Sequence, residues 1–180
     1  MYSKVKNIYR LLRRAVKVLL RRDLFITADS YYKNVRLGSE YGGWNIIAEH
    51  INKNSIVYSF GVGEDISFDL ALINKFGVKV HAFDPTPRSI KWVKDQNLDC
   101  SFIMHEYGVL NYDGLVAFFE PKNSKYISHT IVAGSQKNTS SFDVIVKKLQ
   151  TILKDLQHDS IDLLKMDIEG SEYSVIKDME

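Results

Sequence analysis

Two glycines and a carboxylate in the middle of the chain have the spacing of a nucleotide site. Gly61 and Gly63 directly follow the apolar run Ile56–Phe60, and Asp84 follows a second strand-like run, Lys79–Phe83. A strand, a glycine turn and a helix start bring backbone N–H groups and the positive end of a helix up to a ligand. Asp84 lies 23 positions beyond Gly61, close to the ~20 expected for a carboxylate that binds a ribose diol. The alternatives are a plain strand-to-helix turn and an Asp that caps the following helix.

The residues after the glycines favour a zwitterionic ligand over a dinucleotide. A dinucleotide site calls for a further glycine at position 66, where this chain has Ile66. Glu64 and Asp65 would repel a pyrophosphate but can attract an ammonium group. S-adenosylmethionine offers that ammonium, a carboxylate for backbone N–H groups and a ribose for Asp84. We therefore predict S-adenosylmethionine as the cofactor.

A second group of carboxylates follows another expected strand, Ile161–Met166. If this strand neighbours the glycine strand, Asp167 and Glu169 at its carboxyl end face the same cleft. A carboxylate there can remove a proton from an acceptor hydroxyl, and Asp167 is the first candidate, with Glu169 or His129 behind it. Asp167 and Glu169 could also hold a divalent cation, although we predict no defined metal site. The alternative is that both carboxylates only shape a turn and cap a helix.

Strands and helices alternate through the central part of the chain. The expected strands are Ile56–Phe60, Lys79–Phe83, Ser101–Met104 and Ile161–Met166, and helices are expected at Ile66–Lys75, at about Arg88 to Asp95, and at Ser171–Met179 with Ser171 as its cap. This order predicts an α/β fold with a Rossmann-like, doubly wound, mostly parallel sheet. Ligands in such sheets bind at the carboxyl ends of the strands, where the strand order reverses.

The segment before the glycine strand is expected to be a loop followed by a helix. Residues 29–43 are loop-like, and the apolar residues of Trp44–Ile51 have helical spacing. Gly42 and Gly43 permit a backbone turn that other residues resist. Because they lie shortly before the glycine strand, we expect them to fold over the bound cofactor. A connecting turn is the alternative.

The second half of the chain departs from the alternation. Asn111–Gly114 is a hairpin-turn sequence before the strand-like run Leu115–Phe119, so we expect a β-hairpin insertion. Residues 121–141 are polar and loop-like. Helical spacing then predicts one long core-facing helix through Phe142, Ile145, Val146, Leu149, Ile152, Leu153 and Leu156.

Residues 1–22 are expected to form a basic amphipathic helix, and this helix with a linker to residue 28 precedes the cofactor-binding domain of residues 29–180. All eight charged residues before Asp23 are basic, so the rest of the chain is net acidic and gives no reason to expect nucleic-acid binding. The helix could pack on the domain, make peripheral contact with an anionic membrane surface, or serve as a transit peptide.

Composition narrows the class of protein further. The single cysteine, Cys100, excludes an intramolecular disulfide and a Cys-rich metal site. No apolar run approaches the ~18 residues of a membrane span. A secretory signal has an uninterrupted apolar core after its basic start, whereas the basic residues here continue to Arg22. We therefore expect a cytoplasmic protein, while the oligomeric state stays open.

Three segments resemble the FkbM-type group of S-adenosylmethionine-dependent methyltransferases. They are Ser59–Asp65, Phe83–Pro85 and above all Leu164–Glu172. Arg36–Trp44 resembles the lead-in of one branch of that group, so the resemblance covers roughly Arg36 to Glu180. It implies a class I methyltransferase fold and methyl transfer, often to a hydroxyl oxygen.

The resemblance makes O-methylation of a hydroxyl on a small molecule or glycan the expected function. An NAD(P)-dependent Rossmann oxidoreductase and a non-catalytic nucleotide-binding module stay as alternatives. Ser59 stands where the family motif has an acidic residue, a role that Glu64 or Asp65 could take over. The family fold has seven strands, whereas four core strands are expected here, so we expect a chain that is incomplete at its C-terminal end.

Overall fold

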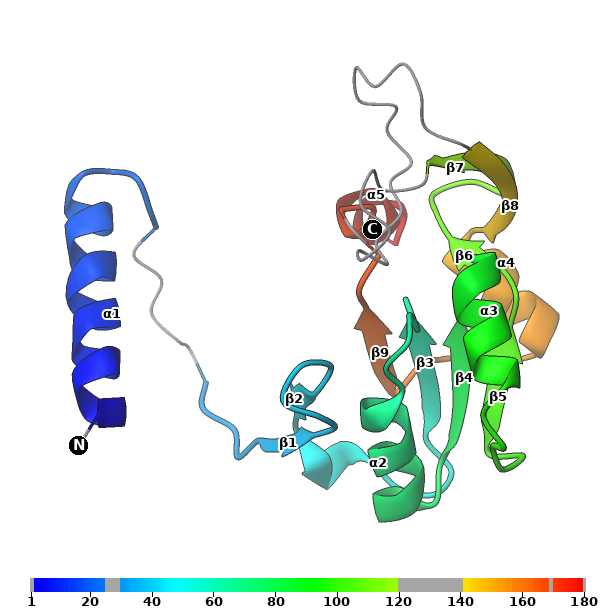
Figure 1. Ribbon diagram of the computed structural model, residues 1–180, viewed down its shortest axis with the longest axis horizontal. Helices are drawn as coiled ribbons and strands as arrows, with labels where there is room; N and C mark the ends of the chain where they lie inside the picture. The colour runs from blue at the N-terminus through cyan, green and yellow to red at the C-terminus, as the bar shows by residue number, and fades with distance from the viewer. Residues whose placement is uncertain (1, 25–29, 120–140, 169, 180) are drawn as a thin grey trace. The chain divides into compact units, whose positions relative to one another are not determined.

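The computed structural model describes residues 2–24, 30–119, 141–168 and 170–179. The chain divides into two compact units, Met1–Lys33 and Asn34–Glu180. The predicted boundary between residues 28 and 29 lies outside the described residues. The first unit holds helix α1 (Tyr2–Leu19), which confirms the helix expected there (Figure 1). No helix among the described residues has both the length and the apolar character needed to cross a membrane.

The second unit is built on a four-stranded parallel sheet in the order β5-β4-β3-β9 (Figure 1). Its elements are β3 (Ile56–Phe60), α2 (Ser67–Phe76), β4 (Lys79–Phe83), α3 (Pro87–Lys94), β5 (Phe102–His105) and β9 (Leu163–Met166). From β3 the chain runs outward through β4 to β5, and it later returns to place β9 on the other side of β3. This confirms the Rossmann-like α/β fold, and the strand order reverses beside the glycine turn.

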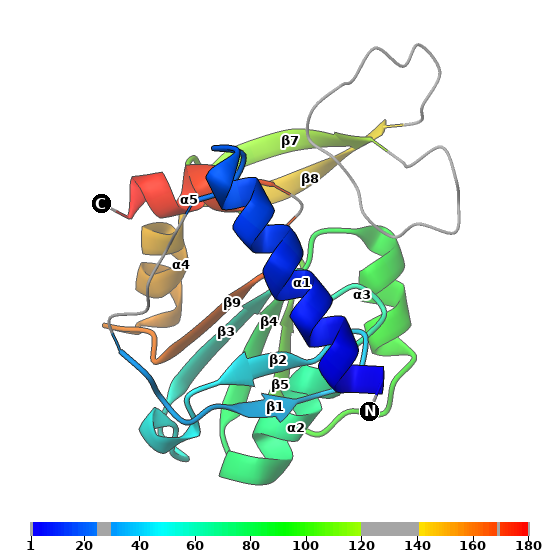
Figure 2. The same cartoon turned by 90° about the vertical axis from the view of Figure 1, so that its left-hand side faces the viewer.

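The two faces of the sheet are covered by different helices. Side chains alternate along β3, so Val57 packs with Phe68 of α2 on one face. Tyr58 packs with Ile152 of α4 (Leu149–Leu156) on the opposite face (Figure 2). Because both faces are buried, β3 is apolar along almost its whole length, and this is why its position could be predicted from the sequence.

The long helix predicted from Phe142 to Leu156 is wrong in its first half. Residues 141–147 form strand β8 (Ser141–Lys147), and only α4 is helical. Val144 and Val146 are buried, whereas Ile145 between them is 52% exposed, which is the alternation of a strand with one covered face. Apolar residues at every second position fit this pattern as well as they fit part of a helix.

The hairpin predicted across Asn111–Gly114 is also wrong. Strand β7 (Gly114–Phe119) pairs antiparallel with β8 (Figure 2). Strand β6 (Gly108–Val109) pairs with the other edge of β8, which gives the order β6-β8-β7. Asp113 in the expected turn instead accepts hydrogen bonds from the Lys148 N–H at 2.7 Å and the Thr151 hydroxyl at 2.8 Å. The turn is thereby tied to the start of α4 rather than closing a hairpin.

The helix predicted over Trp44–Ile51 is wrong as well. Strand β2 (Trp44–Ile46) pairs antiparallel with β1 (Val35–Leu37), and a 3-10 turn, η1 (Ala48–His50), follows. Leu37 and Ile46 are buried in the cluster that contains Phe68 of α2. The ribbon of β1 and β2 therefore covers α2 and brings the segment between its strands close to the helix start.

Because residues 141–147 form a strand, we expect Ile145 and Ile152 to contribute differently to the free energy of unfolding. Replacing Ile152, which is fully buried, by Ala should lower the free energy of unfolding by about 2–5 kcal/mol. Ile145→Ala is the matched control, and it should cost under about 1 kcal/mol because the side chain is half exposed. Urea unfolding followed by circular dichroism measures both. Equal costs would favour the continuous helix, in which both isoleucines face the core.

Candidate functional site

The turn after β3 takes a shape that requires glycine. Gly61 and Gly63 have φ angles of 79° and 59°, in the left-handed region that favours glycine. A Cβ atom on Gly61 would also overlap the carbonyl oxygen of Asp167. The Gly61 N–H donates to the Phe83 carbonyl at 3.0 Å. The ends of β3, β4 and β9 therefore meet at this glycine.

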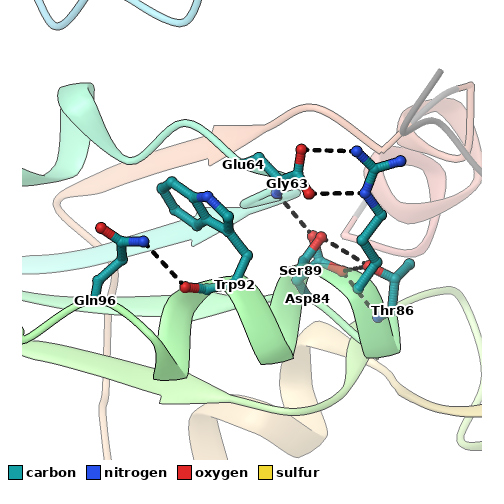
Figure 3. Close-up of polar contacts among 8 residues, drawn as sticks. Gly63, Glu64, Asp84, Thr86, Ser89, Trp92 and Gln96 are labelled. Carbon is teal, nitrogen blue, oxygen red and sulfur yellow. Dashed lines mark hydrogen bonds and ion pairs between the residues drawn. The ribbon is translucent and has the colours of Figure 1, made fainter. Parts of the chain in front are cut away.

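Asp84 joins the end of β4 to the glycine turn. Its Oδ2 accepts hydrogen bonds from the N–H groups of Val62 and Gly63, both at 3.0 Å. Its Oδ1 accepts from the N–H and the hydroxyl of Thr86 at 2.9 and 2.7 Å (Figure 3). The predicted proximity of Asp84 and the glycines is therefore present, with the carboxylate 5% exposed.

The hydrogen bonds of Asp84 bear on its predicted role. A carboxylate has about four lone-pair positions, and the chain itself supplies four donors. A ribose hydroxyl would therefore have to share or replace one of them. The N–H groups of Val62 and Gly63 are also occupied, so they are not free to take a ligand carboxylate. Ribose binding by Asp84 stays a prediction.

The two acidic residues after the glycines have partners within the chain. Glu64 forms a two-pronged ion pair with Arg88, at 2.7 and 2.9 Å (Figure 3), and the hydrogen bonds from Arg88 lower the pKa of Glu64. Asp65 accepts from the Ser39 hydroxyl at 2.7 Å and from the Ser67 N–H at 2.9 Å. Burial alone would raise the pKa of Asp65, but these hydrogen bonds outweigh it and lower the pKa.

The segment between β1 and β2 is attached to the start of α2. The Ser39 N–H donates to the Ser67 hydroxyl at 2.7 Å, and the Gly42 N–H donates to the Ser39 hydroxyl at 2.8 Å. A Cβ atom on Gly42 would lie 2.5 Å from Asp65 Oδ2, and one on Gly43 would overlap the carbonyl oxygen of Ser39. Gly42 thus allows the segment to approach the start of α2 closely, whereas Gly43 allows the segment to fold tightly on itself.

One cavity of ≈ 950 Å³ brings the predicted residues together. Its lining includes all seven residues predicted to bind the cofactor, namely Gly42, Gly43, Gly61, Gly63, Glu64, Asp65 and Asp84. Asp167 lies in the same wall. Phe118 and Val146 of the β6-β8-β7 sheet contribute an apolar side, which the sequence did not reveal because β8 was taken for a helix. The volume is at the upper end of ordinary small-molecule sites.

Asp167 follows β9 directly, and its N–H donates to the Phe60 carbonyl at 3.1 Å. Its side chain is exposed, and within the described residues its carboxylate accepts no hydrogen bond. Glu169 and His129 lie outside the described residues. No group of three or more potential metal ligands occurs in the part of the chain that the structure describes, so a cation held by Asp167 and Glu169 stays an untested hypothesis.

The helix after Asp167, α5 (Glu172–Asp178), begins as predicted, but the Ser171 side chain does not cap it. Glu172 instead accepts the N–H groups of Ile168 and Gly170, at 2.8 and 2.7 Å. Burial alone would raise the pKa of Glu172, but these hydrogen bonds outweigh it and lower the pKa. The predicted turn and helix-start role therefore falls on Glu172, which leaves the Asp167 side chain without a capping role.

Two buried ionisable side chains near the cavity, Lys165 and Asp69, were missed in the sequence. Lys165 of β9 is 8% exposed, lines the cavity, and donates from Nζ to the Gly61 carbonyl at 2.6 Å. Asp69 of α2 is 1% exposed. Burial raises the pKa of Asp69, while the nearby Lys165 ammonium opposes that rise. A carboxylate within the apolar stretch Phe68–Leu72 was the available signal.

Asp69 supplies a buried carboxyl group from α2, whereas β3 has Ser59 at the position where the family motif has an acidic residue. Ser59, at the position where an acidic residue is usual, is fully buried, and its hydroxyl has no hydrogen-bond partner among the described residues. Asp69 Oδ1 likewise has none in the described part of the chain. The carboxyl group that interacts electrostatically with Lys165 thus comes from α2 rather than from β3.

The fold and this cavity define a nucleotide-type α/β domain, and comparison with known proteins gives its family. The methyltransferase FkbM domain matches residues 46–180, three quarters of the chain. The chain therefore belongs to the FkbM methyltransferase domain family. Gly42 and Gly43 precede the matched range, although they line the same cavity.

Two curated relatives support the assignment. The human protein named "Probable methyltransferase-like protein 24" is 28% identical over 137 residues, which are 76% of this chain and 31% of the relative. The protein of that name from Rattus norvegicus is 27% identical over 128 residues, 71% of this chain and 29% of the relative. The chain thus spans less than a third of the length of these relatives. No solved structure matches the chain.

The raised pKa of Asp69 gives a signed pH dependence. The folded state holds this proton more tightly than the unfolded chain, so the contribution of Asp69 to stability falls as the pH rises above its usual value of 3.8. Asp69→Asn removes that loss. The free energy of unfolding of the variant, relative to that of the wild type, should therefore increase from acidic to neutral pH. Urea unfolding at a series of pH values measures this difference.

Asp65→Asn serves as the opposite-sign control for Asp69. The pKa of Asp65 is lowered, so its contribution is lost as the pH falls, and the difference from the wild type should have the reverse slope. A difference between Asp69→Asn and the wild type that stays constant with pH would contradict the assignment.

Proposed function

We propose that the chain is an S-adenosylmethionine-dependent methyltransferase that methylates a hydroxyl oxygen of a small molecule or glycan. The observation that carries the proposal is the convergence of the glycine turn, Asp84 and Asp167 on one cavity at the carboxyl ends of β3, β4 and β9. Ligands of doubly wound sheets bind at this edge. Membership of a methyltransferase family favours this function over nicotinamide-dependent oxidation.

The charges around the cavity suggest how the cofactor is held. Arg36 and Lys165 are the basic residues of the described lining, so they are the candidates to bind a methionine carboxylate, in place of the occupied backbone N–H groups. Asp84 is the candidate for the ribose hydroxyls. The segment with Gly42 and Gly43 would cover the ligand and exclude water from it.

Asp167 is the candidate general base. Glu64 and Asp65 are already bonded to Arg88, Ser39 and Ser67, and Asp84 accepts four hydrogen bonds. Asp167 is therefore the lining carboxylate best placed to receive the proton of an acceptor hydroxyl at Oδ1 or Oδ2. The sulfonium of S-adenosylmethionine supplies an electrophilic methyl group, so the chain mainly has to orient the acceptor oxygen.

The proposal includes a cytoplasmic site of action. A chain with one cysteine forms no internal disulfide, which suits a reducing compartment. Cys100 itself is exposed, and an exposed free thiol is better preserved under reducing conditions.

Calorimetric titration with S-adenosylmethionine tests the cofactor assignment. The wild type should bind with measurable heat, and Asp84→Asn should bind at least tenfold more weakly, because hydrogen bonds to a charged group contribute about 1.5–3 kcal/mol. Asp143→Asn, an exposed carboxylate of β8, is the matched control and should bind like the wild type. Circular dichroism of each variant verifies that it is folded.

The alternatives predict different titration results. Thermal protection by NAD(H) without protection by S-adenosylmethionine would indicate an oxidoreductase. Unchanged affinity in folded Asp84→Asn would remove Asp84 from the site. Binding of the cofactor without turnover on any hydroxyl acceptor would leave a binding module and overturn the catalytic part of the proposal.

A further inference from the structure

Four apolar and aromatic side chains in the described part of α1 lie along one side of the helix and are exposed. Leu12, Val16 and Leu19 are spaced by four and three residues, which places them on one helical face. They are 62%, 57% and 88% exposed, and Tyr9 on the same side is 67% exposed. No described part of the unit Met1–Lys33 covers this apolar face.

The rest of the helix surface carries charge of one sign. Arg13, Arg14 and Lys17 are exposed on the other side of α1, and every charged residue before Asp23 is basic. The remainder of the chain has 16 basic and 22 acidic residues. The net positive charge of this protein thus comes from its first 22 residues, which include the amphipathic helix, and this segment would be attracted to a negatively charged surface.

We propose that α1 lies in the surface of a bilayer containing anionic lipid. In this position the apolar face enters the acyl boundary, while the Arg and Lys side chains reach the lipid phosphates and carboxylates. A helix of 18 residues is roughly 27 Å long, and its charges exclude a spanning orientation. The surface position satisfies both faces of the helix at once.

Charge complementarity alone would also allow a nucleic acid as partner, but the apolar face argues against it. A phosphate backbone would neutralise Arg13, Arg14 and Lys17 and still leave Leu12, Val16 and Leu19 in water. A bilayer covers these side chains as well. The cytoplasmic leaflets of cells carry anionic lipid, so the inference agrees with the location proposed above without depending on methyl transfer.

Flotation of the full chain with vesicles tests this inference. Vesicles of phosphatidylcholine and phosphatidylserine at three to one should carry the protein upward in a sucrose gradient, whereas phosphatidylcholine alone should carry little. The double variant Arg13→Gln, Lys17→Gln should weaken binding roughly 30-fold at low salt, because each basic residue near an anionic surface contributes about fivefold. Raising the salt concentration should release the wild type.

Leu12→Gln tests the apolar contact, since Gln keeps helix propensity and removes the apolar side chain. We expect binding at least tenfold weaker than the wild type. Leu115→Gln is the matched control, because Leu115 of β7 is exposed to a similar extent, 66%, and it should bind like the wild type.

Three outcomes would overturn the inference. The protein could stay at the bottom of the gradient with either vesicle, it could bind neutral and anionic vesicles equally, or Leu12→Gln could bind as well as the wild type. A gel shift with single-stranded RNA at the same salt, combined with absent flotation, would assign the cationic face to nucleic acid instead. Circular dichroism of each variant verifies that it is folded, so that weaker flotation reports the lost contact.

Discussion

The four hydrogen bonds that the Asp84 carboxylate accepts fix the end of β4 against the turn after β3. Two come from Val62 and Gly63 in the turn, and two come from Thr86 at the start of α3. A nearly buried carboxylate needs such donors, and the donors in turn would be left unpaired without it. The shape of the turn and the direction of α3 therefore depend on one side chain. The cavity lies directly over this junction.

The other charges around the cavity follow from the same need for pairing. Glu64 is held by Arg88, and Asp65 is held by Ser39 and Ser67, so both carboxylates already have partners within the chain. A ligand ammonium would have to share them with these partners, and that contact stays a prediction. Asp167 and Lys165 come from the same strand end, where the sheet reverses its order, and both side chains belong to the lining of the cavity.

The sequence predicted those elements whose burial is complete. The run Ile56–Phe60 is apolar because helices cover both faces of β3. A short, almost fully apolar run indicates a buried strand, so no helix was predicted there. For residues 142–146 the apolar spacing fits a strand and a helix, and pairing with β7 decides the outcome over a long sequence separation. Asp69 could not be assigned a role, because its relation to Lys165 arises only when α2 packs on the sheet beside β9. Local spacing predicted which residues meet at the glycine turn, whereas long-range packing placed the apolar wall of the cavity.

Gly61 joins the glycine turn to the backbone of Asp167, the proposed base. Its missing side chain lets the Asp167 backbone approach the turn, its N–H is bonded to Phe83, and its carbonyl accepts from Lys165. Any shift of the turn therefore moves the backbone that carries the Asp167 carboxylate. Reaction between two bound groups is sensitive to displacements of about 1 Å. The packing at this glycine thus fixes the backbone of Asp167, the proposed base, relative to the glycine turn.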